Sequence, residues 1–166
     1  MAARAALGQL WNDVLLAPEK AVRTMRRNLL GVVLVAVFVG LSLLHVYWAV
    51  GGLAGRTAAV PSSSGVPLFR PSSLGTLLVA SCLLIAAVIA AGAAGWFGRN
   101  APIRAFRLLM FAVSLVFVVR AVGDWNYVGF FQRASESAFS YWDLRLYSPL
   151  CLFIGVAGLF LARSKE

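Results

Sequence analysis

Residues 29–50 read LLGVVLVAVFVGLSLLHVYWAV, an apolar run without any Asp, Glu, Lys or Arg. A helix rises about 1.5 Å per residue, so about 20 such residues cross the ~30 Å hydrocarbon core of a bilayer. Three more apolar runs follow along the chain. Backbone polar groups in lipid have to be satisfied within the protein, so these runs predict helices. We expect an all-α, four-helix transmembrane bundle over residues 29–162, with spans at about 29–53, 74–97, 104–122 and 147–162.

The composition agrees with a membrane protein and leaves no room for a separate soluble domain. Of the 166 residues, 61% are apolar and 13% are charged, whereas soluble domains are about half apolar and about a quarter charged. The net charge of +9 raises the question of nucleic acid binding. However, Lys20, Arg23, Arg26 and Arg27 directly precede the first span, where cations suit anionic lipid headgroups. We expect membrane lipids as partners and no nucleic acid.

The distribution of Lys and Arg predicts the orientation of the chain, because short cytoplasmic loops carry an excess of these residues. Ten of the 15 fall on the side of the chain ends, namely Arg4, Lys20, Arg23, Arg26, Arg27, Arg99, Arg104, Arg107, Arg163 and Lys165. The other five are Arg56, Arg70, Arg120, Arg133 and Arg145. This predicts a multi-pass protein of the bacterial inner (plasma) membrane with cytoplasmic N and C termini. We expect the first span to be an uncleaved anchor and residues 163–166 to be a cytoplasmic tail.

Residues 1–28 form a basic segment with a pattern of its own. Apolar residues recur in it at helical spacing, at Leu7, Leu10, Trp11, Val14 and Leu15. This predicts an amphipathic helix that lies on the cytoplasmic membrane surface and is bent at Pro18. A partly ordered tail is the alternative.

Small residues indicate where the spans pack against each other. The second span carries mostly Ala and Gly between residues 86 and 95, and Gly51 and Gly55 form a small-xxx-small pair at the end of the first. Small side chains let helix backbones approach closely. We therefore expect both spans to pack at the centre of the bundle.

The two outer connections differ in composition. Residues 56–73 contain Pro61, Pro67, Pro71 and five serines, which predicts a long loop without helix, of the kind often used as a lid or binding loop. Residues 123–146 are rich in aromatic side chains, which favour the headgroup level of a membrane. Ser148–Pro149 then predicts the start of the last span, with Ser148 as its N-cap.

The sequence lacks the motifs of several enzyme classes. The chain has no Gly-x-Gly-x-x-Gly, P-loop, His-Glu-x-x-His or Cys-x-x-Cys. Cys82 and Cys151 lie on different spans at different depths, so we interpret them as small packing residues rather than as a disulfide. With a single His, neither a metal site nor haem is expected, and the sequence predicts no cofactor.

Ionisable residues at the outer ends of the spans form the candidate site. His45 lies about two turns inside the first span, and Arg120 and Asp124 share one face of the third. Asp143, Arg145 and Tyr147 lead into the fourth. Such residues at membrane depth usually face the bundle interior or a wet cavity, so their common depth favours a pocket open to the outer leaflet. The plainer interpretations are an Arg120–Asp124 salt bridge, a helix cap at Asp143 and a hydrogen bond from His45 to a neighbouring carbonyl.

Three blocks of this sequence carry a resemblance to a known family. HVYWAVGG at 45–52, RAVGDWNYVGFF at 120–131 and DLRLYSPLC at 143–151 resemble the signature blocks of a bacterial family of small four-helix integral membrane proteins of unknown function. The resemblance covers about residues 29–162 and implies a four-span bundle. It implies no activity, but it suggests that the residues shared by the family fall on the polar layer described above.

These residues favour a pocket for a lipid-like ligand and leave several function classes open. As an enzyme, the protein would be a cofactor-free isomerase or terpenoid cyclase acting on an isoprenoid or sterol-like substrate. Its catalytic groups would be Asp124, His45 and Asp143. Its substrate-binding residues would be Tyr47, Trp48, Arg120, Trp125, Tyr127, Arg145 and Tyr147. The alternatives are a non-catalytic accessory or structural membrane subunit and a small-molecule transporter, and a homo-oligomer stays open.

Overall fold

The computed structural model describes residues 2–63, 66–98, 100–124, 128–132 and 137–164. Within them, four helical segments are long and apolar enough to cross a membrane, over Leu16–Ala49, Ser73–Ala93, Ile103–Val122 and Ala138–Arg163. The prediction of an all-helical protein with four membrane spans is therefore confirmed.

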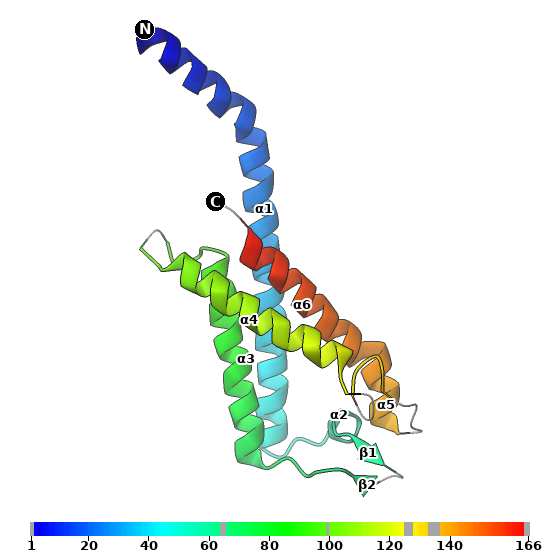
Figure 1. Ribbon diagram of the computed structural model, residues 1–166. Coiled ribbons are helices and arrows are strands. Elements are labelled where there is room, and N and C mark those ends of the chain that lie inside the picture. The colour runs from blue at the N-terminus through cyan, green and yellow to red at the C-terminus, as the bar shows by residue number, and fades with distance from the viewer. Residues whose placement is uncertain (1, 64–65, 99, 125–127, 133–136, 165–166) are drawn as a thin grey trace.

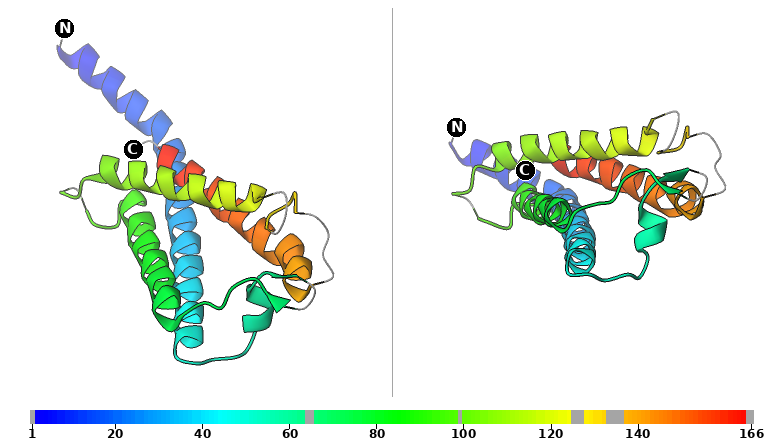
Figure 2. Two further views of the ribbon diagram at one scale, coloured as in Figure 1. Left: turned by 60° about the horizontal axis from the view of Figure 1, so that its bottom comes forward. Right: turned by 90° about the horizontal axis from the view of Figure 1, so that it is seen from below.

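The four long helices are α1 (Ala2–Ala49), α3 (Ser73–Ala93), α4 (Ile103–Val122) and α6 (Ser148–Arg163). Helix α1 packs along α3, and α4 packs along α6. The two pairs cross steeply, so that α1 and α3 are seen end-on in the view from below while α4 and α6 lie across it (Figure 2). We call the end of the bundle near the C-terminus and the α3–α4 connection the terminal end, and the opposite end the loop end (Figure 1).

Helix α1 continues through Pro18 without a break, and its N-terminal part leans away from the bundle (Figure 1). A proline inside a helix removes one amide donor and crowds the preceding turn, which bends the helix without ending it. Whether this part lies on a membrane surface stays a prediction.

At its other end α1 stops at Ala49, because Gly51 has a φ of 103°. A Cβ added to Gly51 would meet nothing within 4 Å, so the close packing expected for Gly51 and Gly55 is wrong.

The Ala-rich half of helix α3 is buried against its neighbours, as its small residues predict, and α3 contacts α1, α4 and α6. Ala90 and Ala93 are fully buried. A Cβ on Gly31 of α1 would lie 2.6 Å from the Cβ of Ala94, so the two backbones approach as closely as glycine allows. The hydroxyl of Ser42 also donates a hydrogen bond across this interface to the carbonyl of Ala80, at 2.8 Å.

The last span begins earlier than its sequence indicates. Helix α5 (Ala138–Trp142) starts at Ser137, whose side chain accepts a hydrogen bond from the amide of Ser140. It runs through a π-helical turn, η1 (Asp143–Tyr147), directly into α6. The expectation that Ser148 is the N-cap is therefore wrong. The amide of Ser148 bonds to the carbonyl of Asp143, five residues back, and this wider turn accommodates Pro149 inside the helix.

The connection between α1 and α3 is more ordered than the predicted loop. It contains a single helical turn, α2 (Arg56–Ala59), and a hairpin of β1 (Ser62–Ser63) and β2 (Val66–Pro67). The hairpin lies at the loop end (Figure 1), and α2 contacts α5, so this connection joins the two helix pairs.

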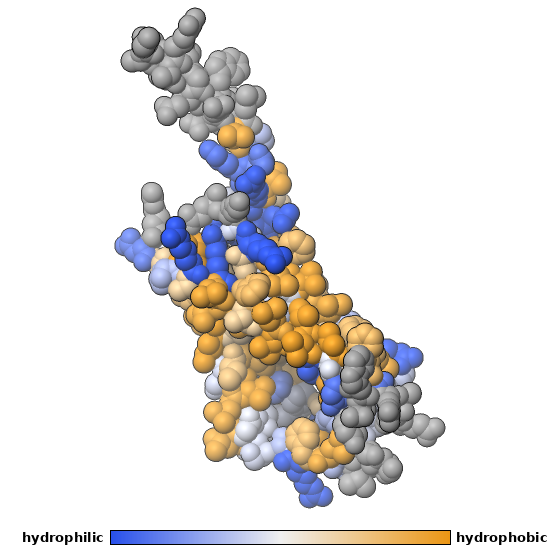
Figure 3. Space-filling model, viewed as in Figure 1, coloured by the Kyte–Doolittle hydropathy of each residue, from blue (hydrophilic) through white to orange (hydrophobic). Residues whose placement is uncertain are grey.

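The surface is divided by polarity along the bundle. An apolar band covers the long helices, and hydrophilic side chains gather at the terminal end (Figure 3). Many Leu, Val and Phe side chains of the spans are exposed, among them Leu43, Leu78, Val116 and Phe160. A surface of this kind is expected of helices that face lipid. It fits the prediction of a multi-pass membrane protein.

Candidate functional site

A pocket of about 380 Å³ lies beside His45 at the loop end of the α1–α3 pair. Three segments build it: the last turn of α1, residues 56–71 and the first turns of α3. Its lining residues are His45, Trp48, Arg56, Ala59, Val60, Phe69, Pro71, Gly75, Thr76 and Val79. The pocket thus brings together two of the predicted site residues, His45 and Trp48.

His45 is half-buried and oriented by its own helix. Its Nδ1 donates a hydrogen bond to the carbonyl of Leu41, at 2.8 Å. Because a carbonyl only accepts, the neutral ring carries its proton on Nδ1 and presents Nε2 as an acceptor. His45 lies one turn from the end of α1 rather than two, since α1 ends at Ala49. The carbonyl contact expected as the plainer interpretation is therefore present, together with a pocket beside the ring.

Trp48 and Arg56 fix the walls of this pocket. The ring of Trp48 packs edge-on against that of His45, with 5.1 Å between centroids. Its Nε1 donates to the carbonyl of Ala54 at 2.8 Å, which holds the turn after α1. The Nη2 of Arg56 donates to the carbonyl of Pro71 at 3.5 Å, which ties α2 to the segment before α3. These bonds hold the loop segments in place around the pocket.

Tyr47, a predicted substrate-binding residue, packs on the turn after α1 and is not among the residues that line the pocket. A Cβ added to Gly52 would overlap the Tyr47 ring, so only glycine fits beneath it. The hydroxyl of Tyr47 accepts a hydrogen bond from the amide of Ala54, at 3.4 Å. In this position Tyr47 stabilises the turn.

Asp143 forms a second polar cluster, between α4 and the last span. The residue is fully buried. Its Oδ1 accepts from Nη2 of Arg120 at 2.8 Å, and its Oδ2 accepts from the amide of Gly129 at 2.7 Å. Oδ2 also accepts from the hydroxyl of Ser148 at 3.2 Å and from Nε2 of Gln132 at 3.4 Å. The carboxylate therefore joins α4, the segment after it, η1 and α6.

The ion pair of Arg120 is formed with Asp143, so the predicted pairing with Asp124 is wrong. Helix α4 ends before Gly123, whose φ is 77°, and Asp124 lies beyond the helix. Spacing of four residues places two side chains on one face only while the helix continues. Asp124 is exposed, and its Oδ1 accepts from the amide of Val128 at 2.9 Å, where the chain turns back.

The predicted single layer is thus divided into two clusters, because Asp124, Asp143 and Arg120 are not among the residues that line the His45 pocket. The guanidinium of Arg145 lies over the ring of Tyr141, 3.9 Å from its centroid. Tyr147 packs against Phe139, with 6.1 Å between ring centroids. Trp125 and Tyr127 lie outside the described residues.

Several residues of both clusters escaped the sequence analysis. Arg56, Phe69 and Thr76 line the pocket from segments interpreted as a loop and a helix start. Gln132 and Ser148 complete the Asp143 cluster. A π-helical turn has no short sequence signature, so the Ser-Pro pair at 148–149 does not indicate that the Ser148 hydroxyl bonds to Asp143. Among the described residues, no group of three or more His, Cys, Asp or Glu is placed to hold a metal ion.

Comparison with protein families shows what this chain is similar to. Residues 38–158 match a family described as "Protein of unknown function (DUF3995)". This stretch begins in the second half of α1 and ends in α6, so it contains both the His45 pocket and the Asp143 cluster. No curated protein and no solved structure gave a match.

Proposed function

We propose that this chain, which belongs to the DUF3995 family of proteins of unknown function, binds an amphiphilic, lipid-like ligand in the pocket beside His45. The ligand would be an isoprenoid or a similar chain that ends in a hydroxyl. We further propose that the protein resides in the bacterial inner membrane with both termini in the cytoplasm, so that the pocket opens toward the outer leaflet.

The composition of the pocket supports this ligand class. Small-molecule sites typically enclose about 300–1,000 Å³ and combine apolar walls with a few polar groups. Here Trp48, Phe69 and Val79 supply apolar surface. Nε2 of His45 is an acceptor in the neutral ring, and the guanidinium of Arg56 is a donor. A hydroxyl both donates and accepts, so it matches this pair.

The location of the pocket supports a ligand that comes from the membrane. His45 and Val79 lie on spans, whereas Arg56 and Phe69 belong to the connection at the loop end. The pocket therefore reaches from the end of the apolar band into the polar connection. An amphiphile at this depth keeps its chain among apolar side chains and its head near the membrane surface.

Binding is better supported than acid-catalysed isomerisation or cyclisation. Protonation of an alkene or epoxide needs an acid within hydrogen-bond reach of the substrate. None of the described residues that line the pocket is an Asp or Glu. Asp143, the buried carboxylate, belongs to the other cluster, and both of its oxygens accept hydrogen bonds. A structural subunit without a ligand remains the main alternative, and a ligand assay separates the two.

The proposal is tested by photolabelling the full-length protein in a neutral detergent. The probe is farnesol that carries a diazirine and an alkyne. We expect the label on peptides within residues 45–79 and its loss when excess farnesol competes. His45→Phe should weaken the labelling, because phenylalanine keeps an aromatic ring at this position but has no Nε2 acceptor.

Val79→Trp should abolish the labelling by filling the pocket. The matched control is Val116→Trp, because Val116 lies on α4, is 67% exposed and does not line the pocket. Equal labelling of wild type and Val79→Trp, or label spread evenly over exposed helix surfaces, would contradict a site at His45.

A further inference from the structure

The connection between α1 and α3 exposes large apolar side chains at the loop end of the bundle. They follow the last turn of α1, precede α3 or lie in its first turn, and they are Val50, Leu53, Leu68, Phe69 and Leu74. Leu53 and Leu74 are the clearest cases, with exposed fractions of 75% and 70%. The surface of this connection is therefore less polar than its serines and prolines indicate.

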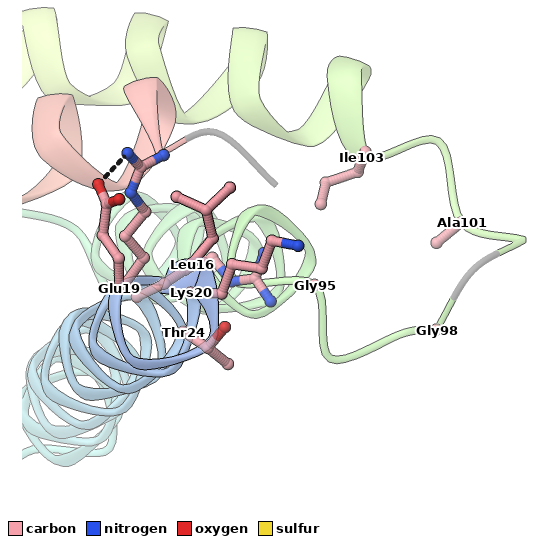
Figure 4. A pocket seen from close by; sticks show the side chains of 10 residues that line it. Leu16, Glu19, Lys20, Thr24, Gly95, Gly98, Ala101 and Ile103 are labelled. Carbon is pink, nitrogen blue, oxygen red and sulfur yellow. Dashed lines mark hydrogen bonds and ion pairs between the residues drawn. The ribbon is translucent and has the colours of Figure 1, made fainter. Parts of the chain in front are cut away.

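The length of α3 places this connection at the boundary of the hydrocarbon core. Helix α3 has 21 residues, and its length of about 31 Å is close to the hydrocarbon thickness of a bilayer. At the terminal end, charged side chains of α1 gather beside the connection from α3 to α4, among them Glu19, Lys20 and Arg23 (Figure 4). This charged layer marks one boundary of the core, so Leu74, at the start of α3, lies at the other.

The connection runs sideways at this level. It passes from the end of α1 to α2 and the hairpin and then returns to the start of α3 (Figure 1). Helix α2 contacts α5, so the connection is held against the bundle. Apolar and hydrophilic side chains lie next to each other at this end (Figure 3). The interface of a membrane accommodates such a mixture, because headgroups and the first part of the acyl chains meet there.

The backbone of the connection suits a layer with little free water. The amides of Gly52 and Leu68 donate to the carbonyls of Tyr47 and Pro61, each at 2.9 Å. Residues 61, 67 and 71 are prolines, which have no amide to satisfy. Amides that are bonded within the protein lose little when lipid displaces water around them.

The charges of the connection favour the phosphates of lipid headgroups. Residues 50–74 contain Arg56 and Arg70 and neither Asp nor Glu. Arg70 is exposed and directly follows the exposed Phe69. A cation beside apolar side chains at membrane level is attracted to lipid phosphates. No carboxylate of this stretch opposes that attraction.

We propose that the connection between α1 and α3 is immersed in the headgroup layer of the membrane, with Leu53, Leu68 and Leu74 toward the acyl chains and Arg70 at the lipid phosphates. The partner of this surface is the phospholipid layer that continues from the apolar band of the spans (Figure 3). The proposal does not depend on a ligand at His45. Phe69 also lines the His45 pocket, so that pocket would open within the headgroup layer.

The test measures the depth of single labels in the full-length protein, reconstituted into vesicles of phosphatidylcholine and phosphatidylglycerol. Cys82 and Cys151, both free thiols, are first replaced by alanine. A nitroxide is then attached to Leu53→Cys, Leu68→Cys or Leu74→Cys. Its EPR relaxation reports collisions with oxygen, which concentrates in the bilayer, and with a water-soluble nickel chelate.

Two further labelled variants serve as references. Leu78→Cys represents the hydrocarbon core, because Leu78 lies on α3 and is 60% exposed. Glu19→Cys represents water, because the Glu19 side chain is 56% exposed and charged. At the three test positions, we expect the ratio of oxygen to nickel collisions to lie between the two references and to exceed that of Glu19→Cys several-fold.

Three results would overturn the proposal. A ratio at Leu53 and Leu68 equal to that of Glu19→Cys would place the connection in water, and a ratio equal to that of Leu78→Cys would place it within the core. Low collision rates with both reagents would show that another protein surface covers it.

A second measurement excludes insertion driven by the nitroxide itself. A bimane fluorophore is attached to the same three positions, and the vesicles contain lipids that carry the nitroxide instead. A nitroxide on the headgroup should quench the bimane more strongly than one in the middle of the acyl chain, and Leu78→Cys should show the reverse order. Absence of quenching by both lipids at Leu53 and Leu68 would contradict the proposal.

Discussion

At the scale of single residues, the surroundings of a carboxylate decide what it can do. Asp143 is fully buried and accepts hydrogen bonds from Arg120, Gly129 and Ser148. These donors come from both helices of the α4–α6 pair and from the segment between them. We therefore expect Asp143 to hold the loop end of this pair together rather than to supply a proton.

Asp143→Asn should destabilise the protein strongly. The substitution removes the counter-ion of Arg120, whose side chain is 34% exposed, and leaves a partly buried guanidinium unpaired. Breaking a buried pair from one side typically costs about 3–5 kcal/mol. Thermal unfolding in detergent should show a clearly lower Tm. The double variant Asp143→Asn/Arg120→Gln should lose less than the sum of the two single losses.

Glu19→Gln is the control for this prediction. Glu19 pairs with Arg23, and both side chains are more than half exposed. Exposed pairs contribute little to stability, so the Tm of this variant should stay close to that of the wild type. Equal destabilisation by both substitutions, or strictly additive losses in the double variant, would show that Arg120 does not depend on Asp143.

At the scale of elements, glycines set how closely the helices approach. Gly158 of α6 lies against Ser114 and Met110 of α4, and a Cβ added to it would lie 2.6 Å from Cε of Met110 and overlap the Ser114 hydroxyl. That hydroxyl is fixed by a bond to the carbonyl of Met110, at 2.6 Å. Helices α4 and α6 therefore touch each other at Gly158.

Gly158→Ala should separate these helices and destabilise the protein by about 1–3 kcal/mol, the usual result of overpacking a core.

Gly40 of α1 offers the opposite case, because a Cβ there would meet nothing within 4 Å. Gly40→Ala should raise stability by about 0.5–1 kcal/mol through the higher helix propensity of alanine. Thermal unfolding of the two variants measures both changes in stability. A Gly158→Ala variant that is more stable than the wild type would contradict the close approach of α4 and α6.

The same elements show what a sequence can and cannot predict. The length of the apolar runs determines the four spans, and the Ala-rich residues 86–95 correctly indicate the part of α3 that packs against other helices. These properties depend on residues close together in sequence. The partner of Arg120 does not, because it is set by the reversal of the chain after Gly123. The His45 pocket likewise needs Arg56 and Phe69, whose positions depend on how residues 50–72 fold back.

At the scale of the whole molecule, the two ends of the bundle differ in chemistry. The pocket at the loop end is mostly apolar and contains His45, whereas a second pocket at the terminal end is lined by Glu19, Lys20, Arg23 and Arg27 of α1. The α1–α3 pair builds much of both pockets, since α1 runs from Lys20 in one to Trp48 in the other.

The orientation of the molecule follows from the same asymmetry and is open to a direct test. The terminal end carries Lys20, Arg23, Arg26 and Arg27, and short segments rich in Lys and Arg stay in the cytoplasm. We expect a reporter that is active only in the cytoplasm to be active when fused after Glu166 and inactive when inserted at Ser62. A reporter that is active only outside should give the reverse pattern. Cytoplasmic activity at Ser62 would place the His45 pocket on the inner side and contradict its access from the outer leaflet.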